Sequence, residues 1–400
     1  MVMMTTPSTI ASPSRIEWPV YEEDEIEAVL AVLHSGQVNY WTGTVCREFE
    51  QEYARYFGVQ HAIALMNGTV ALELALDALG IGPGDEVIVS PRTFIATASS
   101  VVMRGATPVC CDVDRDSGNI TAETIAPAIT PRTKAVIPVH LGGWPCEMPA
   151  IVALAHAHGL KVIEDCAQTH GAQLRGQYAG SFGDIAAWSF CQDKIISTGG
   201  EGGMVTVNDP ALWSPMWSMK DHGKSWDAVY QREHAPGFRW LHESFGTNGR
   251  MTEMQGAIGR LQLQKLSGWV EKRRRLAGIV EQTLAPLAAV RIPTIPAHVY
   301  HAYYRCYVYL RPEALKDGWD QTRLMTAISE QGCKCAVGSC GEIYREKAFT
   351  DAGFQPTERL PVARELGETS LAFLVHHTQS EVAVADRAEI AARVIAQATR

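Results

Sequence analysis

The chain has 400 residues, a hydrophobic fraction of 46% and a formal net charge of −9 at pH 7. This length gives room for two domains, and the composition is that of a globular enzyme with a large core. The acidic balance argues against nucleic acid as a partner, because phosphate binding needs clustered Lys and Arg. No apolar run reaches the length of a membrane span, and the N-terminus lacks the apolar segment of a secretory signal. We therefore expect a soluble, cytoplasmic protein with no membrane partner.

The ten cysteines are scattered along the chain, and several lie inside apolar runs. This distribution favours buried free thiols in a reducing compartment over disulfides. Cys333 and Cys335 form a C-x-C pair with Cys340 nearby, but the second pair of ligands that zinc needs is missing. We therefore predict no metal site.

The first two-thirds of the chain read as a large α/β domain. After an N-terminal arm (residues 1–20), apolar residues recur at helical spacing up to Gly36, and a second helix ends at Gly58. From His61 to Asn208 short apolar strands then alternate with helices of about ten residues. Such alternation indicates βαβ units and a mostly parallel, seven-stranded-type sheet between layers of helices. We place this domain at residues 21–265.

The pattern changes after Asn208. Residues 213–245 are rich in Trp, His and Gly without clear periodicity, which predicts a long ordered loop. Two helices are expected next, over residues 251–266 and 269–287. Strand and helix patterns after residue 300 then predict a smaller C-terminal α+β domain, residues 266–400.

Chemistry-bearing side chains follow two of the predicted strands. The strand that begins at Lys161 ends in Asp165, and the strand that begins at Ile185 leads to Ser189 and Lys194. In an open α/β sheet the carboxyl ends of the strands form the edge where ligands bind. A lysine that forms a Schiff base and an acid that pairs with a pyridinium nitrogen are what pyridoxal 5'-phosphate (PLP) requires. The alternative is that Lys194 is an ordinary surface lysine and that Asp165 only caps a helix.

Three further positions fit the same cofactor. Gly68 and Thr69 open a helix whose N-terminus would bind the cofactor phosphate, unless they only cap it. Phe94 follows a strand and would stack on the pyridine ring, although a core phenylalanine is nearly as plausible. Gln168, three residues after Asp165, would lie beside the ring or remain an ordinary polar residue. The glycines of residues 199–203 precede a strand and lack the phosphate-loop signature, so close backbone packing explains them better.

As a set, these residues resemble the DegT/StrS family of PLP-dependent sugar aminotransferases, which have the fold-type-I (aspartate aminotransferase-like) architecture. Order and spacing match from about Trp18 to the C-terminal helix. The motifs that carry the resemblance are NGTVAL (67–72), PRTFIATA (91–98), VIEDCAQTHGA (162–172), GSFGDIAAWSFCQDK (180–194), GEGGMV (200–205), GTNGRMTEMQGAIGRLQL (246–263) and HAYYRCYV (301–308).

The resemblance implies a role for each site residue. Lys194 would be the catalytic lysine that holds PLP and moves the proton. The other cofactor-binding residues would be Asp165 at the ring nitrogen, Phe94 on the ring, Gln168 beside it, and Gly68, Thr69 and Ser189 at the phosphate. Asn248 would reach the phosphate of the partner subunit, so a homodimer with shared sites is expected. One departure is that Cys191-Gln192-Asp193 stands where the family usually has Tyr or His shortly before the lysine.

The implied function is amino transfer from glutamate or glutamine to a keto sugar in amino-sugar biosynthesis, and a nucleotide-linked sugar is the expected acceptor. Three alternatives stay open at this point. A cyclitol aminotransferase would act on an inosose-type ketone. A sugar dehydratase of the same family would carry histidine in place of Lys194. A non-catalytic PLP-binding regulator would need a DNA-binding domain, for which the short, non-basic N-terminus leaves no space. His222, Arg250, Tyr304 and His376 are further candidates for substrate contact, each equally plausible as structural residues.

Overall fold

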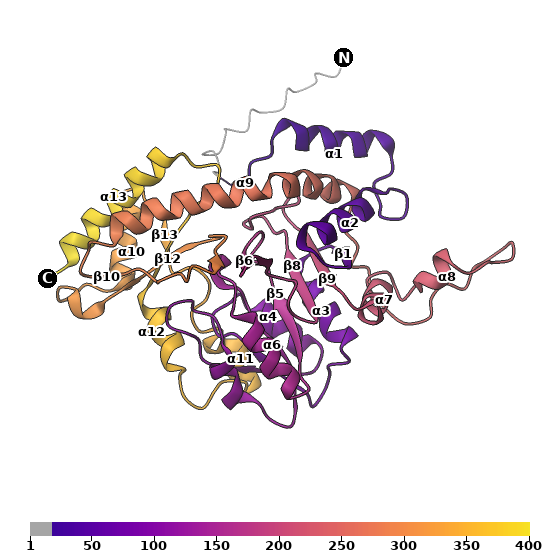
Figure 1. The fold of residues 1–400 in the computed structure, drawn as a ribbon, viewed down its shortest axis with the longest axis horizontal. Helices are drawn as coiled ribbons and strands as arrows, with labels where there is room; N and C mark the ends of the chain where they lie inside the picture. The colour runs from indigo at the N-terminus through magenta and orange to yellow at the C-terminus, as the bar shows by residue number, and fades with distance from the viewer. Residues whose placement is uncertain (1–17) are drawn as a thin grey trace, which may run out of the picture.

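The computed structural model describes residues 18–400, so most of the expected N-terminal arm, residues 1–20, lies outside the described residues. A seven-stranded sheet forms the centre of the larger part of the chain, with helices on both of its faces (Figure 1). β9 runs antiparallel to both of its neighbours, and the other strands pair in parallel, as the sequence predicts. In spatial order the strands are β1 (His61–Leu65), β9 (Gly203–Val207), β8 (Ile185–Ser189), β5 (Lys161–Asp165), β4 (Thr133–Ile137), β2 (Glu86–Val89) and β3 (Thr107–Cys110).

The central strands are apolar on both sides because helices cover both faces of the sheet. In β8, Ile185 and Ala187 pack into one core cluster, while Ala186 and Trp188 pack into another on the opposite face. This alternation follows the two-residue period of a strand. The helices of this part are α1 (Glu23–Ser35), α2 (Val45–Phe57), α3 (Gly68–Ala78), α4 (Ala96–Met103), α5 (Ala122–Ile125), α6 (Met148–Ala157), α7 (Pro210–Met219) and α8 (Trp226–Tyr230).

A smaller antiparallel sheet occupies the C-terminal part of the chain, as expected. Its spatial order is β10 (Val290–Arg291), β12 (Cys306–Leu310), β14 (Ser370–Phe373) and β13 (Cys335–Ala336). The helices of this part are α10 (Gln321–Glu330), α11 (Lys347–Ala352), α12 (Pro361–Thr369) and α13 (Glu381–Ala398). A third, small sheet joins β11 (Val299–Tyr300) to β6 (Gln173–Leu174) and β7 (Gln177–Tyr178), and so links the two parts.

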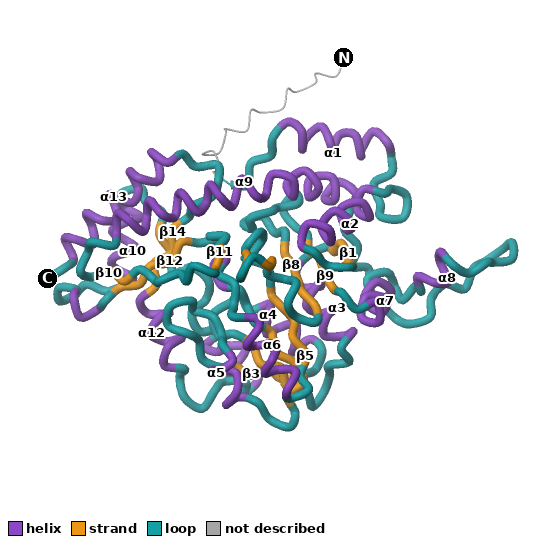
Figure 2. The backbone as a smooth tube through the Cα atoms, viewed as in Figure 1, coloured by secondary structure: helices purple, strands orange, loops and turns teal. Residues whose placement is uncertain are grey.

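One long helix, α9 (Glu253–Leu284), replaces the two helices predicted for residues 251–266 and 269–287. Gly268, which lies between the two predicted helices, is inside α9, since helical backbone tolerates an isolated glycine at a modest cost. α9 packs against α1 and α2 near its start and against α13 further along (Figure 2). The expected boundary between residues 265 and 266 falls within this helix, and we retain it only as a proposal.

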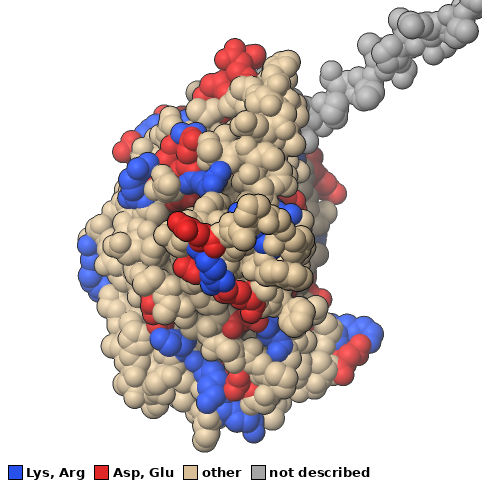
Figure 3. All heavy atoms as spheres, turned by 90° about the vertical axis from the view of Figure 1, so that its right-hand side faces the viewer, with Lys and Arg blue, Asp and Glu red and all other residues tan. Residues whose placement is uncertain are grey.

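The region predicted as one loop, residues 213–245, contains the end of α7 and all of α8. From α8 onward the chain projects from the body of the protein (Figure 1), and we call residues 226–248 the arm. Phe238, Trp240 and Phe245 on the arm are largely exposed. The face from which the arm projects shows broad areas without charged side chains, with both signs of charge interspersed (Figure 3). An apolar stripe on α1, formed by Ile26, Leu30 and Leu33, is also exposed.

The cysteines are all free thiols, and seven of the ten are buried. Burial raises the pKa of Cys110 well above its usual range, so these thiols stay protonated at neutral pH. Among the helices of residues 18–400, none combines the length and the apolar character that a membrane span requires.

Candidate active site

Asp165 and Ser189 come together because β5 and β8 are parallel neighbours. Asp165 pairs in register with Ala187, two residues before Ser189. Both strands therefore deliver polar side chains to the same edge of the sheet, which is where open α/β sheets bind ligands. This juxtaposition follows from the strand order, which the sequence alone does not specify.

The Asp165 carboxylate is buried and fixed from two sides. The Thr97 hydroxyl donates to Oδ2 at 2.8 Å, and the Ala167 N–H donates to Oδ1 at 3.2 Å. Burial raises the pKa of Asp165 above its usual value, while Thr97, the Ala167 N–H and the Lys194 ammonium act in the opposite direction. Thr97 was not among the predicted site residues, although its place in the first turn of α4, the helix that follows β2, was a usable signal.

Lys194 lies in a turn that follows β8. Its N–H donates to the Cys191 carbonyl at 3.0 Å, and its side chain is 15% exposed. Burial alone would lower the pKa of Lys194, but Tyr304, Asp193 and Asp165 outweigh burial and raise the pKa above its usual value. The lysine therefore faces two carboxylates and an aromatic hydroxyl at the edge of the sheet.

Gly68 and Ser189 form a narrow cradle at the start of α3. A Cβ on Gly68 would lie 2.7 Å from the Ser189 Cβ, so only glycine fits there. The Asn67 side chain caps the helix by accepting from the Val70 N–H at 2.9 Å. The first N–H groups of α3, near Thr69, belong to the end that carries partial positive charge and binds anions.

The glycine cluster packs closely against the backbone next to this cradle, as predicted. A Cβ on Gly203 would lie 2.4 Å from the backbone of Asn67. Glycine therefore lets β9 approach the turn between β1 and α3. The signal that identified this role was the position of the glycines directly before a strand.

Phe94 and Gln168 differ in exposure. Phe94 is 67% exposed, so it is not a core phenylalanine and its ring is open to a ligand. Gln168 is buried in a turn rather than one helical turn after Asp165 as expected. Its Oε1 accepts from the Gly142 N–H at 2.8 Å, and its Nε2 donates to the Ser339 hydroxyl at 3.2 Å.

Asn248, another predicted site residue, lies at the end of the arm. Its side chain is exposed, and its backbone forms a bridge with Asp221. Arg250, a further candidate for substrate contact, instead donates to the Asp221 carboxylate at 2.7 Å. Tyr304, another such candidate, does reach the site, where its hydroxyl donates to Asp193.

Beneath the site, Glu164 is a buried carboxylate that the prediction did not explain. It accepts N–H groups from Gly180 at 2.8 Å and from Phe182 and Gly183 at 2.7 Å. His140 Nε2 lies 3.0 Å from the same carboxylate, and its Nδ1 accepts from the Cys146 N–H at 2.9 Å. His140, Glu164 and Cys166 are close enough together to suggest a metal, but the donors around Glu164 already account for both of its oxygens.

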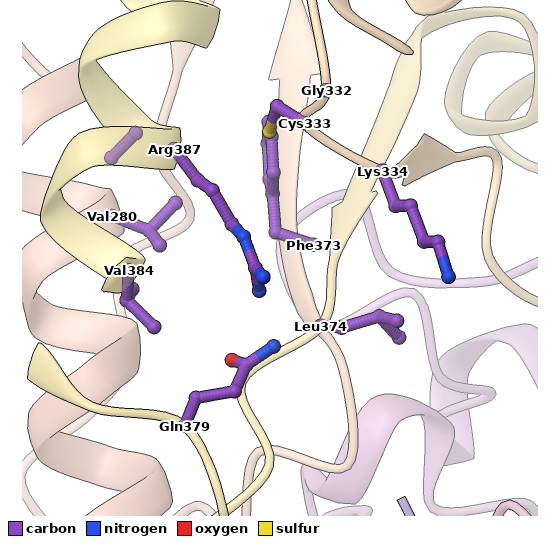
Figure 4. A pocket seen from close by; sticks show the side chains of 10 residues that line it. Val280, Gly332, Cys333, Lys334, Phe373, Leu374, Gln379, Val384 and Arg387 are labelled. Carbon is purple, nitrogen blue, oxygen red and sulfur yellow. The ribbon is translucent and has the colours of Figure 1, made fainter. Parts of the chain in front are cut away.

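An enclosed cavity lies elsewhere in the protein. It has a volume of about 180 Å³ and lies beside α9, α13 and the end of β14, with Val280, Cys333, Phe373 and Arg387 in its lining (Figure 4). None of its lining residues is a predicted site residue. This cavity is therefore separate from the predicted site at the edge of the large sheet.

The edge of the large sheet fits PLP on three observations of this structure. The Gly68–Ser189 cradle, which any Cβ would fill, suits a phosphate. The Asp165 carboxylate is buried and oriented, as a partner for a ring nitrogen must be. Lys194 is the amine at the same edge, and the Phe94 ring is exposed there.

The fold and this set of residues define a PLP-dependent aminotransferase. Residues 19–393 match the model of the DegT/DnrJ/EryC1/StrS aminotransferase family, so the chain belongs to that family.

Two relatives and one solved structure illustrate the similarity. The chain is 40% identical over 354 residues to a UDP-N-acetyl-3-dehydro-alpha-D-glucosamine 3-aminotransferase of Acidithiobacillus ferrooxidans, covering 88% of this chain and 89% of the relative. It is 47% identical over 250 residues to a GDP-perosamine synthase of Caulobacter vibrioides, covering 62% of this chain and 64% of the relative. The structure of an aminotransferase from Psychrobacter cryohalolentis superposes with a TM-score of 0.93 at 52% identity, covering 95% of this chain and 98% of that one.

Proposed function

We propose that this enzyme transfers an amino group from glutamate or glutamine to a keto sugar linked to a nucleotide, in amino-sugar biosynthesis. The observation that carries the proposal is the position of Lys194 and Asp165 at one edge of the sheet, above the ends of two adjacent strands. The names of the relatives support a nucleotide-linked acceptor, since one acts on a UDP sugar and another on a GDP sugar. These names do not agree on one nucleotide, so we propose none. The cytoplasmic location expected from the sequence stays part of the proposal.

In this proposal each side chain has one task. Bound PLP supplies an electron sink for the substrate carbon. The Lys194 Nζ would hold the cofactor and, as a neutral amine, would accept the proton from the substrate carbon and return it. Asp165, held by Thr97 and by the Ala167 N–H, would pair with the ring nitrogen. Gly68, Thr69 and Ser189 bind the phosphate, Phe94 contacts the ring face, and Gln168 lies beside the ring.

We favour an aminotransferase over a sugar dehydratase because position 194 holds lysine, where the dehydratase would carry histidine. It is tested by incubating the purified protein with glutamate alone. We expect about one 2-oxoglutarate per subunit, followed by continuous turnover when a UDP- or GDP-linked keto sugar is added. Product from an inosose but from neither sugar would favour the cyclitol alternative. Product with glutamine and none with glutamate would change the donor.

The cofactor lysine is identified separately, by borohydride reduction of the protein and mass spectrometry of its peptides. The expected result is a phosphopyridoxyl group on Lys194. A label on any other lysine would overturn the assignment of the site.

A homodimer completes the proposed site. Asn248 is exposed at the base of the arm, and three exposed aromatic residues lie further along the arm, which suits an interface with a second copy. The exposed stripe on α1 offers a second apolar surface for the same partner. Two-fold symmetry would place Asn248 of each subunit at the phosphate of the other.

Subunit mixing tests this shared site. A dimer of one Lys194→Ala and one Asn248→Ala subunit contains one site with both residues intact. Random mixing should therefore restore about a quarter of the wild-type activity from two parents of low activity. Activity that stays at the parental average would argue against sharing.

A further inference from the structure

The residue before Lys194 places a carboxylate directly beside the lysine amine. Lys194 Nζ lies 3.7 Å from Asp193 Oδ1. Neighbouring residues of a strand point to opposite faces, but here the chain turns, with the Lys194 N–H donating to the Cys191 carbonyl at 3.0 Å. The turn therefore lets two consecutive side chains face each other.

Two residues from the C-terminal part of the chain fix this carboxylate from the other side. The Tyr304 hydroxyl donates to Asp193 Oδ2, and Arg305 Nη2 lies 3.3 Å from the same oxygen. The guanidinium of Arg305 also lies 4.3 Å from the centre of the Tyr304 ring. Oδ2 is thus occupied by Tyr304 and Arg305, which leaves Oδ1 toward Lys194.

The backbone that carries Tyr304 and Arg305 is itself held in place. The Arg305 N–H donates to the Gly142 carbonyl at 3.2 Å, and the Gly142 N–H donates to Gln168 at 2.8 Å. The Tyr304 ring also faces the lysine, with its centre 5.0 Å from Nζ. Lys194 therefore lies between Asp193 and Tyr304. Through Arg305 and Gly142, the backbone that carries Tyr304 is hydrogen-bonded to the segment that contacts Gln168.

The charges agree with this arrangement. Burial alone would raise the pKa of Asp193, but the Lys194 ammonium, the Tyr304 hydroxyl and the Arg305 guanidinium outweigh burial and hold the pKa below its usual value. The carboxylate is 48% exposed, so it stays ionised and accessible to solvent at neutral pH. It can accordingly pair with an ammonium group without taking its proton.

We propose that Asp193 is a positioning residue that directs the Lys194 amine and balances its charge whenever the amine is protonated. The inference rests on the proposed role of Lys194. When Nζ takes a proton from carbon it becomes an ammonium, and the Asp193 carboxylate lies beside the new positive charge. When Nζ returns the proton, the ion pair is lost, and a neutral amine remains beside the carboxylate. The proton never moves to Asp193, so no other reactant is needed.

The first test uses the protein stripped of PLP, so that it does not depend on turnover. We would label Lys194 with trinitrobenzenesulfonate across a pH series and quantify the labelled peptide. Removing the carboxylate in Asp193→Asn favours the neutral, reactive amine at lower pH. At about pH 8 the variant should therefore label roughly tenfold faster than the wild type, and its profile should shift to lower pH. An unchanged profile would overturn the proposal.

A matched control is Asp116→Asn. Asp116 is 53% exposed and pairs with Arg291 of the C-terminal part at 2.6 Å, so it resembles Asp193 in exposure and in its arginine partner. Its replacement should leave the Lys194 profile unchanged. Tyr304→Phe, which removes only the hydroxyl that orients Asp193, should shift the profile in the same direction as Asp193→Asn and by less.

Kinetics of the PLP-loaded enzyme provide the second test. Asp193→Asn should lower kcat roughly tenfold to a hundredfold and leave the KM for both substrates within about twofold. A rise in KM for the sugar with kcat and the labelling profile unchanged would assign Asp193 to substrate binding and overturn the proposal. A lower unfolding temperature without either effect would reduce it to a structural link. Borohydride labelling of wild-type Lys194 separates these failures from failure of the proposed function.

Discussion

Two regions of the protein, the ends of β5 and β8 and the arm, differ in how far a single chain buries and pairs their side chains. At the strand ends, Asp165 and Glu164 are buried and every carboxylate oxygen of Glu164 accepts hydrogen bonds from its own chain. On the arm, Phe238, Trp240 and Phe245 are exposed, and so is Asn248 at its base. The comparison teaches that the side chains at the strand ends find their partners within one chain, whereas the arm presents apolar side chains that one chain leaves exposed.

Replacing Lys194 should have the largest effect on the strand-end region. Lys194→Ala removes both the amine that holds PLP and the group that moves the proton, so turnover should fall by at least about 10³-fold. Because Lys194 lies in a turn and its ion-pair partner Asp193 is 48% exposed, the unfolding temperature of the cofactor-free protein should change little. Activity assays and thermal unfolding measure the two quantities. Near-normal turnover would contradict the proposed chemistry.

Glu164 tests whether the strand-end region owes its order to its own hydrogen bonds. Glu164→Ala leaves three N–H groups, that of Gly180 buried, and the buried His140 without their acceptor, which should lower the free energy of unfolding by about 3 kcal/mol or more. Glu164→Gln, which keeps an acceptor oxygen, should lose less. Chemical denaturation measures both. Equal stability of the alanine variant and the wild type would show that water replaces the carboxylate.

The arm should respond through association rather than folding. Trp240→Ala removes an exposed aromatic side chain that we place at the interface, and such residues contribute about 2 kcal/mol or more to binding. The dissociation constant of the dimer should rise roughly thirtyfold. Sedimentation measures it. The control Val382→Ala, at another exposed apolar residue on α13, should leave association unchanged.

The smallest effect is a pH dependence of the buried histidine His170. Burial lowers its pKa from 6.5 to about 3, so the folded protein keeps it neutral while the unfolded chain takes up a proton below pH 6.5. Its contribution to stability is therefore complete above pH 6.5 and declines as the pH falls toward 3.

Between about pH 8 and pH 5.5 the wild type should lose roughly 1.4 kcal/mol of stability through His170. His170→Gln should remove that part of the loss. Denaturant titrations at the two pH values measure the difference. His158→Gln, at an exposed histidine after α6, should change it little. A full loss in His170→Gln would mean that other groups carry the acid sensitivity.

The sequence by itself determined the strands of the large sheet and the residues at their ends. β1 has the predicted bounds His61–Leu65, because a five-residue apolar strand is encoded by adjacent residues. The positions of Asp165, Ser189 and Lys194 at or after strand ends were predictable for the same reason, because each follows its apolar strand directly in the sequence. The break predicted near Gly268 was wrong, since α9 continues where packing against α13 offsets the low helix propensity of glycine.

Only the tertiary structure decided which distant residues meet. Tyr304 reaches Asp193 across 111 positions of the chain, and Thr97 reaches Asp165 across 68. Local periodicity carries no record of such contacts, because they depend on strand order and on how the C-terminal part packs against the large sheet. The exposure of Phe94 and of the arm was decided in the same way: an aromatic residue reads alike in a sequence whether it fills a core or faces a ligand or a second subunit.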